Sequence, residues 1–184
     1  MFIFFNETLN TRNLTFISMR FCLLLIFFLQ VFLVDAQPEF LTIGVNGLTC
    51  SQCTRNVEMK LRKLSFVTGV KMNLQQTNGV LSVKPTGLDP SAIARAVRDA
   101  GFSLRFMEMI VDEPNAPDTT VFRIGSNLFR IIPTDQPFLP GSTVRFIGQE
   151  FLSPAEYRKW KPKLPKASKS ATYYLAVVKK STTS

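Results

Sequence analysis

Apolar residues in the middle of the chain recur with two different spacings, which predict a strand followed by a helix. The run Phe40–Val45 is apolar and β-branched, as is typical of a strand. Val57, Leu61 and Leu64 then recur at helical spacing, with charged residues at many of the other positions. We therefore expect an amphipathic helix that begins near Ser51, directly after the strand and a short loop.

The next stretch alternates in the way that paired strands do. Val70–Leu74 and Val80–Val83 each alternate, and Asn78-Gly79 between them favours a tight hairpin turn. A second helix is expected next, because Asp89-Pro90 combines an N-cap with a proline at the first helical position. Gly101 is expected to end this helix. Its apolar stripe consists of Ile93, Val97 and Ala100.

A final strand, Phe106–Val111, completes the order β-α-β-β-α-β over residues 38–112. This order predicts an α+β domain with the ferredoxin-like fold, in which both helices lie on one face of an antiparallel sheet. The fold alone does not determine a function.

Residues 118–184 differ in character from this domain and follow a polar, proline-containing linker, residues 113–117. Proline and glycine turns divide the segment into short strand-like runs, which predict a small, basic, β-rich module. These runs are Val121–Ile124, Leu128–Ile132, Thr143–Ile147 and Tyr173–Val178. The module holds most of the chain's net charge of +9, which is densest from Arg158 to Lys169 around Trp160.

The N-terminal residues carry the pattern of an export signal. Met19 and a basic residue precede the unbroken apolar run Phe21–Leu29, and Val34-Asp35-Ala36 offers a cleavage site. We therefore expect residues 1–36 to be a signal peptide with its true start at Met19, and the mature protein to be exported, either periplasmic or secreted. The alternative is a membrane anchor through an uncleaved N-terminal helix, because Phe21–Val34 approaches the ~20 apolar residues that span a bilayer.

Export changes how the basic C-terminal segment is interpreted. Cationic segments with an aromatic residue can bind nucleic acid. An exported protein rarely meets nucleic acid, so no such partner is expected. Anionic membrane or envelope surfaces are better candidates for this charge, and a solvated surface without a partner is the alternative.

Only Cys50 and Cys53 remain in the mature chain, and their spacing favours chemistry over cross-linking. A disulfide between residues so close removes little entropy from the unfolded chain. Both sulfurs are expected on a loop and the first turn of a helix, where free N–H groups and the helix dipole stabilise thiolates. The chain contains no histidine, so two thiolates form a soft site that suits Cu(I), Hg(II) or Cd(II). Zn(II) prefers four ligands and requires two molecules to share the ion.

The run from Gly47 to Cys53, Gly-Leu-Thr-Cys-Ser-Gln-Cys, resembles the GMxCxxC signature of heavy-metal-associated domains. These domains occur in copper chaperones, copper ATPases and periplasmic mercury-binding proteins, and the resemblance extends from about Phe40 to Val111. It implies an aromatic residue, Phe102, close to the site. It also implies that Cys50 and Cys53 bind the metal, with Gly47, Leu48, Thr49 and Ser51 as near-site support. Leu48 replaces a family methionine that packs in the core, so this departure leaves the metal interpretation intact.

The resemblance implies a metal carrier and not an enzyme. The protein is expected to capture a soft ion, Cu(I) in first place, and to exchange it with a donor or acceptor protein that exposes thiolates. The first alternative is a thiol-disulfide oxidoreductase that uses the same CxxC pair. Against it, the pair lacks the Trp-Cys-Gly-Pro-Cys context of thioredoxin-like enzymes. The second alternative is an interaction module whose cysteines stay oxidised and inert.

Overall fold

The computed structural model describes residues 39–111, 121–138, 141–165 and 172–178, and its helices and strands all lie in these ranges. In chain order they are β1 (Glu39–Asn46), α2 (Ser51–Leu61), β2 (Val67–Asn73), β3 (Asn78–Val83), α3 (Pro90–Asp99), β4 (Ser103–Val111), β5 (Val121–Ile124), β6 (Asn127–Ile131), β7 (Ser142–Ile147), α4 (Pro154–Trp160), the 3-10 helix η2 (Lys161–Lys163) and β8 (Thr172–Val177). The expected signal peptide, residues 1–36, and the expected linker, residues 113–117, lie outside the described residues, so both stay predictions. No helix in the described ranges is long and apolar enough to cross a membrane.

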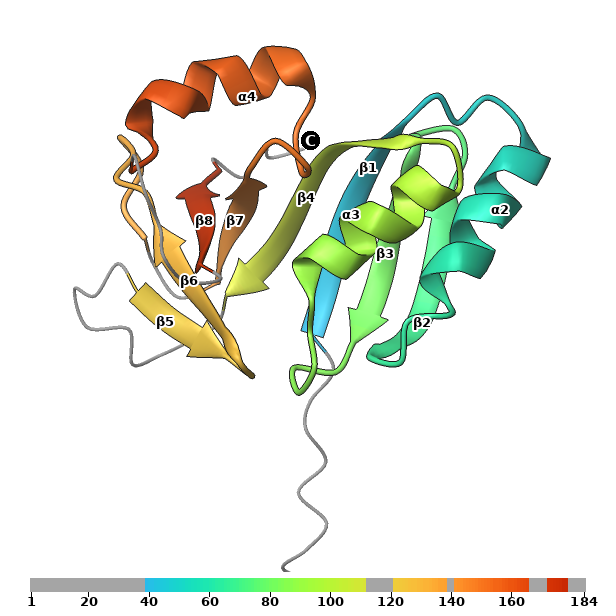
Figure 1. Cartoon of the computed structure of the whole chain (residues 1–184), viewed down its shortest axis with the longest axis horizontal. Helices are drawn as coiled ribbons and strands as arrows, with labels where there is room; N and C mark the ends of the chain where they lie inside the picture. The colour runs from blue at the N-terminus through green and yellow to red at the C-terminus, as the bar shows by residue number, and fades with distance from the viewer. Residues whose placement is uncertain (1–38, 112–120, 139–140, 166–171, 179–184) are drawn as a thin grey trace, which may run out of the picture. The chain divides into compact units, whose positions relative to one another are not determined.

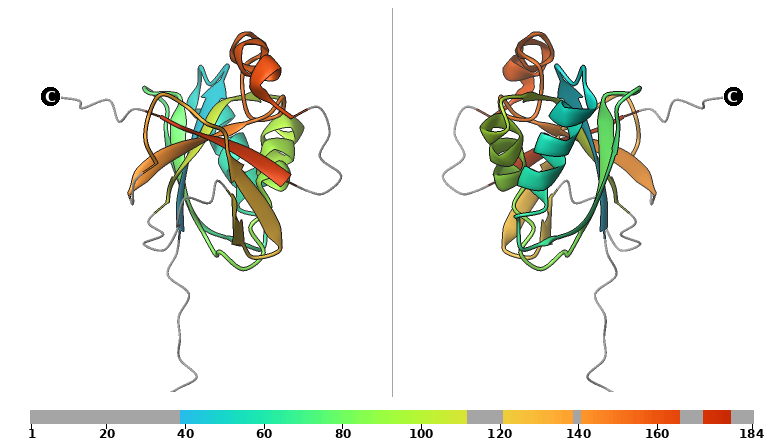
Figure 2. Two further views of the ribbon diagram at one scale, coloured as in Figure 1. Left: turned by 90° about the vertical axis from the view of Figure 1, so that its left-hand side faces the viewer. Right: turned by 90° about the vertical axis from the view of Figure 1, so that its right-hand side faces the viewer.

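The first four strands and two helices form the predicted βαββαβ unit (Figure 1). Strands β2, β3, β1 and β4 are neighbours in this order, and all their pairings are antiparallel. Helices α2 and α3 lie together on one side of these strands (Figure 2). The ferredoxin-like fold expected from the sequence is therefore confirmed.

Both ends of α3 form at the residues that the sequence analysis identified. The Asp89 side chain accepts a hydrogen bond from the N–H of Ala92, and Pro90 occupies the first turn. Gly101 follows the helix with a φ of 90°, a left-handed conformation that favours glycine. Local sequence signals therefore fix the length of this helix.

The β2–β3 hairpin forms as predicted, but its turn uses other residues. Asn73 pairs with Asn78, so the turn lies at residues 74–77 and Asn78-Gly79 belongs to β3. Thr77, with a φ of 49°, takes the left-handed position in place of glycine. Gly79 is required for packing instead, because a Cβ atom there would overlap the sulfur of Met72 on the paired strand.

One arginine connects the end of α2 to the outermost strand of this unit. Arg62 forms an ion pair with Glu58 of α2, with 2.7 Å between the charged atoms. Its guanidinium also donates a hydrogen bond to the carbonyl oxygen of Val70 in β2, at 2.8 Å. Strand β2 is one of the two edges of the sheet.

The strands of the C-terminal segment continue the same sheet. Strand β4 pairs with β7 as well as with β1, and Glu108 lies opposite Arg145 in this pairing. The complete order is β2-β3-β1-β4-β7-β8-β6-β5, and β6–β8 is the one parallel pairing among the described strands. The segment is β-rich, as predicted, but the sequence carries no signal that its strands pair with β4. All described residues belong to one compact unit.

One hydrophobic core extends under both halves of the sheet. Leu41 and Val57, from β1 and α2, belong to the same cluster as Phe129 and Phe146 of the C-terminal strands, and all four are fully buried. The ring centroid of Phe129 lies 5.5 Å from that of Tyr173 and 6.1 Å from that of Phe146. Because buried aromatic rings contribute large apolar areas, we expect the two halves to unfold together.

Helix α4 was not predicted, and it packs on the other face of the sheet. Side chains alternate between faces along a strand, so Ile147 and Ala176 point away from the main core. They form a second cluster, against which Trp160 of α4 packs. Ser153-Pro154 supplies the same N-cap and proline signal that identified α3, and it could have revealed this helix.

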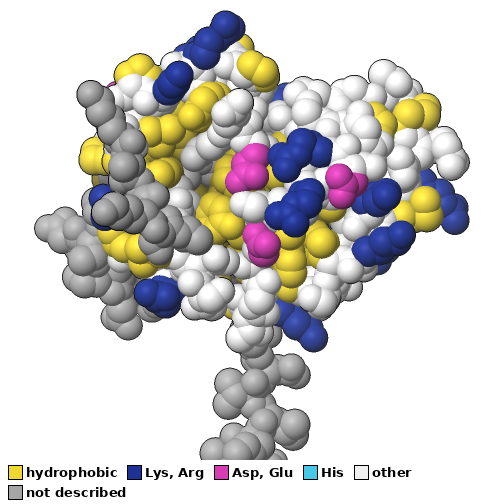
Figure 3. Space-filling view, in the orientation of Figure 1, with side chains coloured by type: hydrophobic (Ala, Val, Ile, Leu, Met, Phe, Trp, Pro, Cys, Tyr) yellow, Lys and Arg dark blue, Asp and Glu magenta, His cyan; other side chains and the backbone are white. Residues whose placement is uncertain are grey.

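The face that carries α2 and α3 presents mixed charges. Figure 3 shows acidic and basic side chains side by side over the middle of this face, with apolar side chains gathered toward the C-terminal strands. Arg98 of α3 pairs with Glu150, in the turn between β7 and α4, at 4.0 Å. Contacts between the two halves of the chain are therefore polar as well as apolar.

Phe129→Ala is expected to lower the free energy of unfolding by about 3–5 kcal/mol, because it removes a fully buried ring and leaves a cavity. Since the core is continuous, hydrogen exchange should accelerate in β1 as well as in β6. Ile110→Ala, at a side chain that is 59% exposed, is the matched control and should change stability by less than about 0.5 kcal/mol. Faster exchange confined to residues 121–178 would contradict a shared core.

Candidate metal centre

Cys50 and Cys53 lie between β1 and α2, at the positive end of the helix dipole. Cys50 is the N-cap of α2, and its sulfur accepts a hydrogen bond from the N–H of Cys53 at 3.1 Å. The first turn of α2 contains no acidic residue, so no carboxylate there offsets the partial positive charge of the helix end. That charge stabilises a thiolate at either position.

The structure shows the two cysteines as a disulfide, with their Cα atoms 5.2 Å apart. Cys50 is exposed, whereas Cys53 is half-buried and packs against the core. Reduction of the bond by two electrons and two protons releases two neighbouring thiols. The structure thus brings the two sulfurs together, while their role as metal ligands stays a prediction.

The loop before the cysteines is anchored by Leu48 and Gly47. Leu48 is 3% exposed and belongs to the main core, which is the packing role expected of this position. Gly47 has a φ of 84°, so any side chain there would strain the turn. Thr49 and Ser51 are exposed on either side of Cys50. The loop therefore holds Cys50 at the surface, on a buried anchor.

Phe102 lies beside this loop. Its ring is 3.5 Å from the position that a Cβ atom would take at Gly47, and it packs against the core. The N–H of Phe102 donates a hydrogen bond to the carbonyl oxygen of Val97, at 3.1 Å, so the residue is tied to the end of α3. The half-buried ring is therefore held next to the turn that leads to Cys50.

Asn56 was not identified from the sequence, yet it joins the two helices next to the cysteines. It lies three residues after Cys53, and its side-chain amide donates a hydrogen bond to the carbonyl oxygen of Ala100, at 3.1 Å. Carbonyl groups at the C-terminal end of a helix lack hydrogen-bond donors within the helix, and the amide of Asn56 is such a donor for α3. The sequence signal for Asn56 was that an uncharged polar residue stands next to Val57, which belongs to the apolar stripe of the helix.

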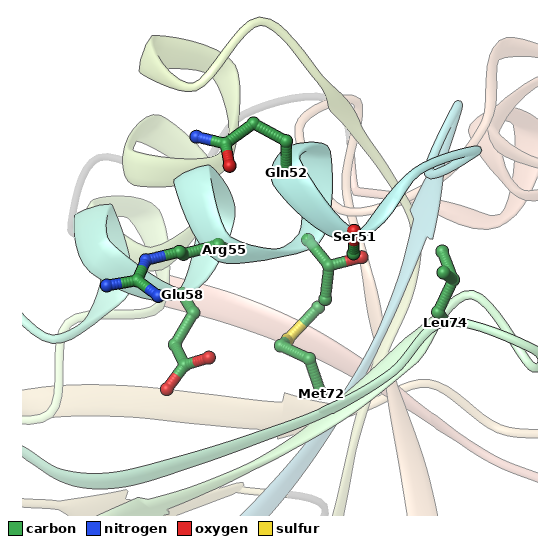
Figure 4. A pocket seen from close by; sticks show the side chains of 7 residues that line it. Ser51, Gln52, Arg55, Glu58, Met72 and Leu74 are labelled. Atoms are coloured by element: carbon green, nitrogen blue, oxygen red, sulfur yellow. The ribbon is translucent and has the colours of Figure 1, made fainter.

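An open pocket of about 410 Å³ adjoins the first turns of α2 (Figure 4). Its lining residues are Ser51, Gln52, Thr54, Arg55, Glu58, Met72 and Leu74. Met72 comes from β2 and Leu74 from the turn after it, while the other five come from α2. The pocket thus adjoins the cysteine loop at Ser51, and the sequence analysis did not identify it.

The cysteine pair is a soft donor set. Within the described ranges, no three or more His, Cys, Asp or Glu side chains form a group that could hold an ion. Thiolates favour Cu(I) and other soft ions, whereas carboxylate and carbonyl oxygens favour Mg²⁺ and Ca²⁺. The chemistry of the pair therefore fits a soft ion.

A ferredoxin-like unit with two cysteines at the start of its first helix is the arrangement of a soft-metal-binding domain. Residues 42–103 match the family model of the heavy-metal-associated domain. This part of the chain is therefore a heavy-metal-associated domain, as its sequence resemblance indicated.

Curated relatives match part of the chain. Copper-transporting ATPase 2 of Homo sapiens is 34% identical over 69 residues, which are 38% of this chain and 5% of the human protein. Copper-transporting ATPase 1 of Rhizobium meliloti is 39% identical over 62 residues, 34% of this chain and 7% of that protein. The chain thus spans only a small fraction of the length of these relatives. Among solved structures, oxidized MerP from Ralstonia metallidurans is similar at 25% identity and a TM-score of 0.35, covering 36% of this chain and 96% of MerP.

Phe102→Ala is expected to open the cysteine loop to solvent and to competing thiols, because the ring packs beside Gly47. In the reduced protein, alkylation of the cysteines by iodoacetamide, followed by mass spectrometry, should become several-fold faster. Phe122→Ala, which removes another half-buried ring in β5, is the control and should leave the rate unchanged. Equal acceleration in both variants would indicate general loosening and not a local shield.

Proposed function

We propose that this protein binds a soft metal ion between the thiolates of Cys50 and Cys53 and passes it on by ligand exchange. The observation that carries the proposal is the position of the two sulfurs at the N-terminus of α2, where the helix dipole stabilises thiolates. The family match and the similarity to copper-transporting ATPases support Cu(I) as the cargo. Hg(II) and Cd(II) are alternative cargoes, as is Zn(II) where two molecules share the ion.

The cysteine pair has to be reduced before it can bind an ion. In the disulfide, the two sulfurs are bonded to each other and carry no charge. Two electrons and two protons convert them to thiols, and loss of the protons then gives the thiolates that bind metal. In an oxidising compartment, the protein therefore needs a reductant or prompt loading with metal.

Exchange with a partner is expected to begin on the side of Cys50. This residue is exposed, whereas Cys53 packs against the core. In loading, the sulfur of Cys50 and then that of Cys53 bind the ion and replace the donor's thiolates. In delivery, the acceptor's thiolates reach the ion from the exposed side and replace the sulfurs of the carrier in turn. No covalent bond of a substrate is made or broken, so we propose a carrier and not an enzyme.

Cu(I) titration of the reduced protein, in competition with a Cu(I) chelator and without oxygen, tests the proposal. The wild type is expected to take up one ion per molecule, because it offers one pair of soft donors. The double variant Cys50→Ser, Cys53→Ser is expected to take up none above background. Serine is also a good N-cap, so the variant should preserve α2. Equal uptake by the two proteins would reject Cu(I) as the cargo, and equal uptake in the same titration with Hg(II) as well would reject the metal proposal.

The disulfide makes thiol-disulfide exchange the second candidate function. An oxidoreductase would reduce insulin through the same pair. In this assay the wild type is expected to be no faster than the double serine variant. A rate typical of an oxidoreductase would replace the metal proposal. If the protein shows no metal uptake and no insulin reduction, the remaining interpretation is an interaction module whose cysteine pair is oxidised and inert.

We further propose that the protein acts outside the cytoplasm and that its basic C-terminal surface binds an anionic membrane or envelope surface. The exposed cations on and directly after α4 are Arg158, Lys159, Lys161 and Lys163. The ammonium group of Lys163 lies 5.4 Å from the centroid of the Trp160 ring. Clustered cations attract anionic headgroups.

N-terminal sequencing of the mature protein distinguishes cleavage after Ala36 from a retained anchor.

Removal of two cations near α4, Lys161→Ala and Lys163→Ala together, is expected to weaken binding to phosphatidylserine vesicles by about 1 kcal/mol per lysine. Vesicle co-sedimentation at low salt measures this. The pair Lys60→Ala and Lys63→Ala changes the net charge equally at α2 and is the control. If both pairs weaken binding equally, the attraction depends on overall charge and not on this surface.

A further inference from the structure

The C-terminal half contacts the heavy-metal-associated domain at the beginning of α3. The hydroxyl of Tyr173, in β8, donates a hydrogen bond to Asp89 at 3.2 Å and lies 3.1 Å from the hydroxyl of Ser91. Ser91 donates a hydrogen bond to Glu150 at 2.7 Å, and Glu150 also pairs with Arg98 at 4.0 Å. Two separate C-terminal segments, β8 and the turn before α4, therefore hold the same helix.

Tyr173 is itself held firmly. Its ring packs within the aromatic part of the core, with its centroid 5.5 Å from that of Phe129 and 5.9 Å from that of Phe151. Burial raises the pKa of its phenol above the ordinary value of 10.0, because the charged phenolate loses more hydration than the neutral hydroxyl does. A rigid ring thus presents a permanent polar contact to α3.

The β5–β6 hairpin adds a third contact, to the loop that precedes α3. The side-chain amide of Asn127 donates a hydrogen bond to the carbonyl oxygen of Leu88. Gly125, in the hairpin turn, approaches Pro85 so closely that a Cβ atom would lie 3.0 Å from its carbonyl oxygen. Three segments therefore hold the start of α3: β8, the turn before α4 and the β5–β6 hairpin.

The end of α3 borders the cysteine loop. Ala100 accepts the hydrogen bond from Asn56 of α2, and the ring of Phe102 packs beside Gly47. A ten-residue α-helix is a stiff rod about 15 Å long. When its start is fixed, the position of its end is restricted as well.

We infer that the C-terminal half positions α3, and that Tyr173 and Asn56 are positioning residues that keep Phe102 beside the cysteine loop. This inference rests on the proposed function of Cys50 and Cys53 and gives the described residues of the C-terminal half, 121–138, 141–165 and 172–178, a part in it. These residues complete the metal-binding domain instead of forming a separate module. They control how easily a competing thiol or chelator reaches the pair.

Tyr173→Phe removes the hydroxyl and keeps the ring, so it tests the contact with α3. Two rates are measured: iodoacetamide alkylation of the reduced, metal-free cysteines, and removal of Cu(I) by a chelator. Both are expected to rise several-fold. Asn56→Asp, which has the same shape but cannot donate when ionised, should act in the same direction. Tyr174→Phe, on the opposite face of β8, is the matched control and should change neither rate.

A combination with Phe102→Ala decides whether Tyr173 acts through Phe102. If it does, the double variant is alkylated no faster than Phe102→Ala alone, because the two changes remove the same shield. Fully additive effects, or an unchanged rate in Tyr173→Phe, would overturn the inference. If Tyr173→Phe fails to fold, judged by thermal unfolding, Ser91→Ala breaks the same network and replaces it.

Alkylation requires no metal, so the two proposals fail in different ways. A wild type that binds neither Cu(I) nor Hg(II) rejects the proposed function and leaves the alkylation comparison valid. A wild type that binds Cu(I), with equal alkylation rates in wild type and Tyr173→Phe, keeps the function and rejects the positioning role.

Discussion

The pairing of β4 with β7 is the contact on which the rest of the structure depends. In a βαββαβ unit with this strand order, β4 is an edge, and its outward N–H and C=O groups need partners. Strand β7 supplies them, and the pairing is reinforced by Glu108 and Arg145, whose charged atoms are 2.6 Å apart with side chains 18% and 27% exposed. Once these strands are joined, β8 and β6 extend the same sheet beyond β7. Their aromatic side chains then pack into the core shared with β1 and α2, and Tyr173 of β8 contacts the start of α3.

Local signals predict the elements of this chain well, and their partners poorly. Asp89-Pro90 and Gly101 define α3 because capping depends on neighbouring residues. Asn78-Gly79 misled the turn assignment because Gly79 is required by Met72 on another strand, which is a contact that sequence spacing does not show. The same limit applies to β4 and β7. Alternation predicts both strands, but either could pair with any other strand.

The residues of the candidate site also divide into those that local sequence predicts and those that it does not. The two cysteines and Leu48 lie within one short run of the sequence, so the motif and its position before a helix were enough to identify them. Phe102 came from the family resemblance, since nothing local connects it to the loop. Asn56 offered only a weak local signal and Tyr173 offered none, because their hydrogen bonds depend on how α3 is placed between the two halves of the chain.

The hydrogen bond from Arg62 to Val70 has a consequence for the open edge of the sheet at β2. At an open strand edge, another chain can pair its own strand with the exposed N–H and C=O groups. With its guanidinium on a carbonyl oxygen of β2, Arg62 occupies part of this edge and carries a charge there. Addition of a strand from another chain is therefore disfavoured at this point of β2.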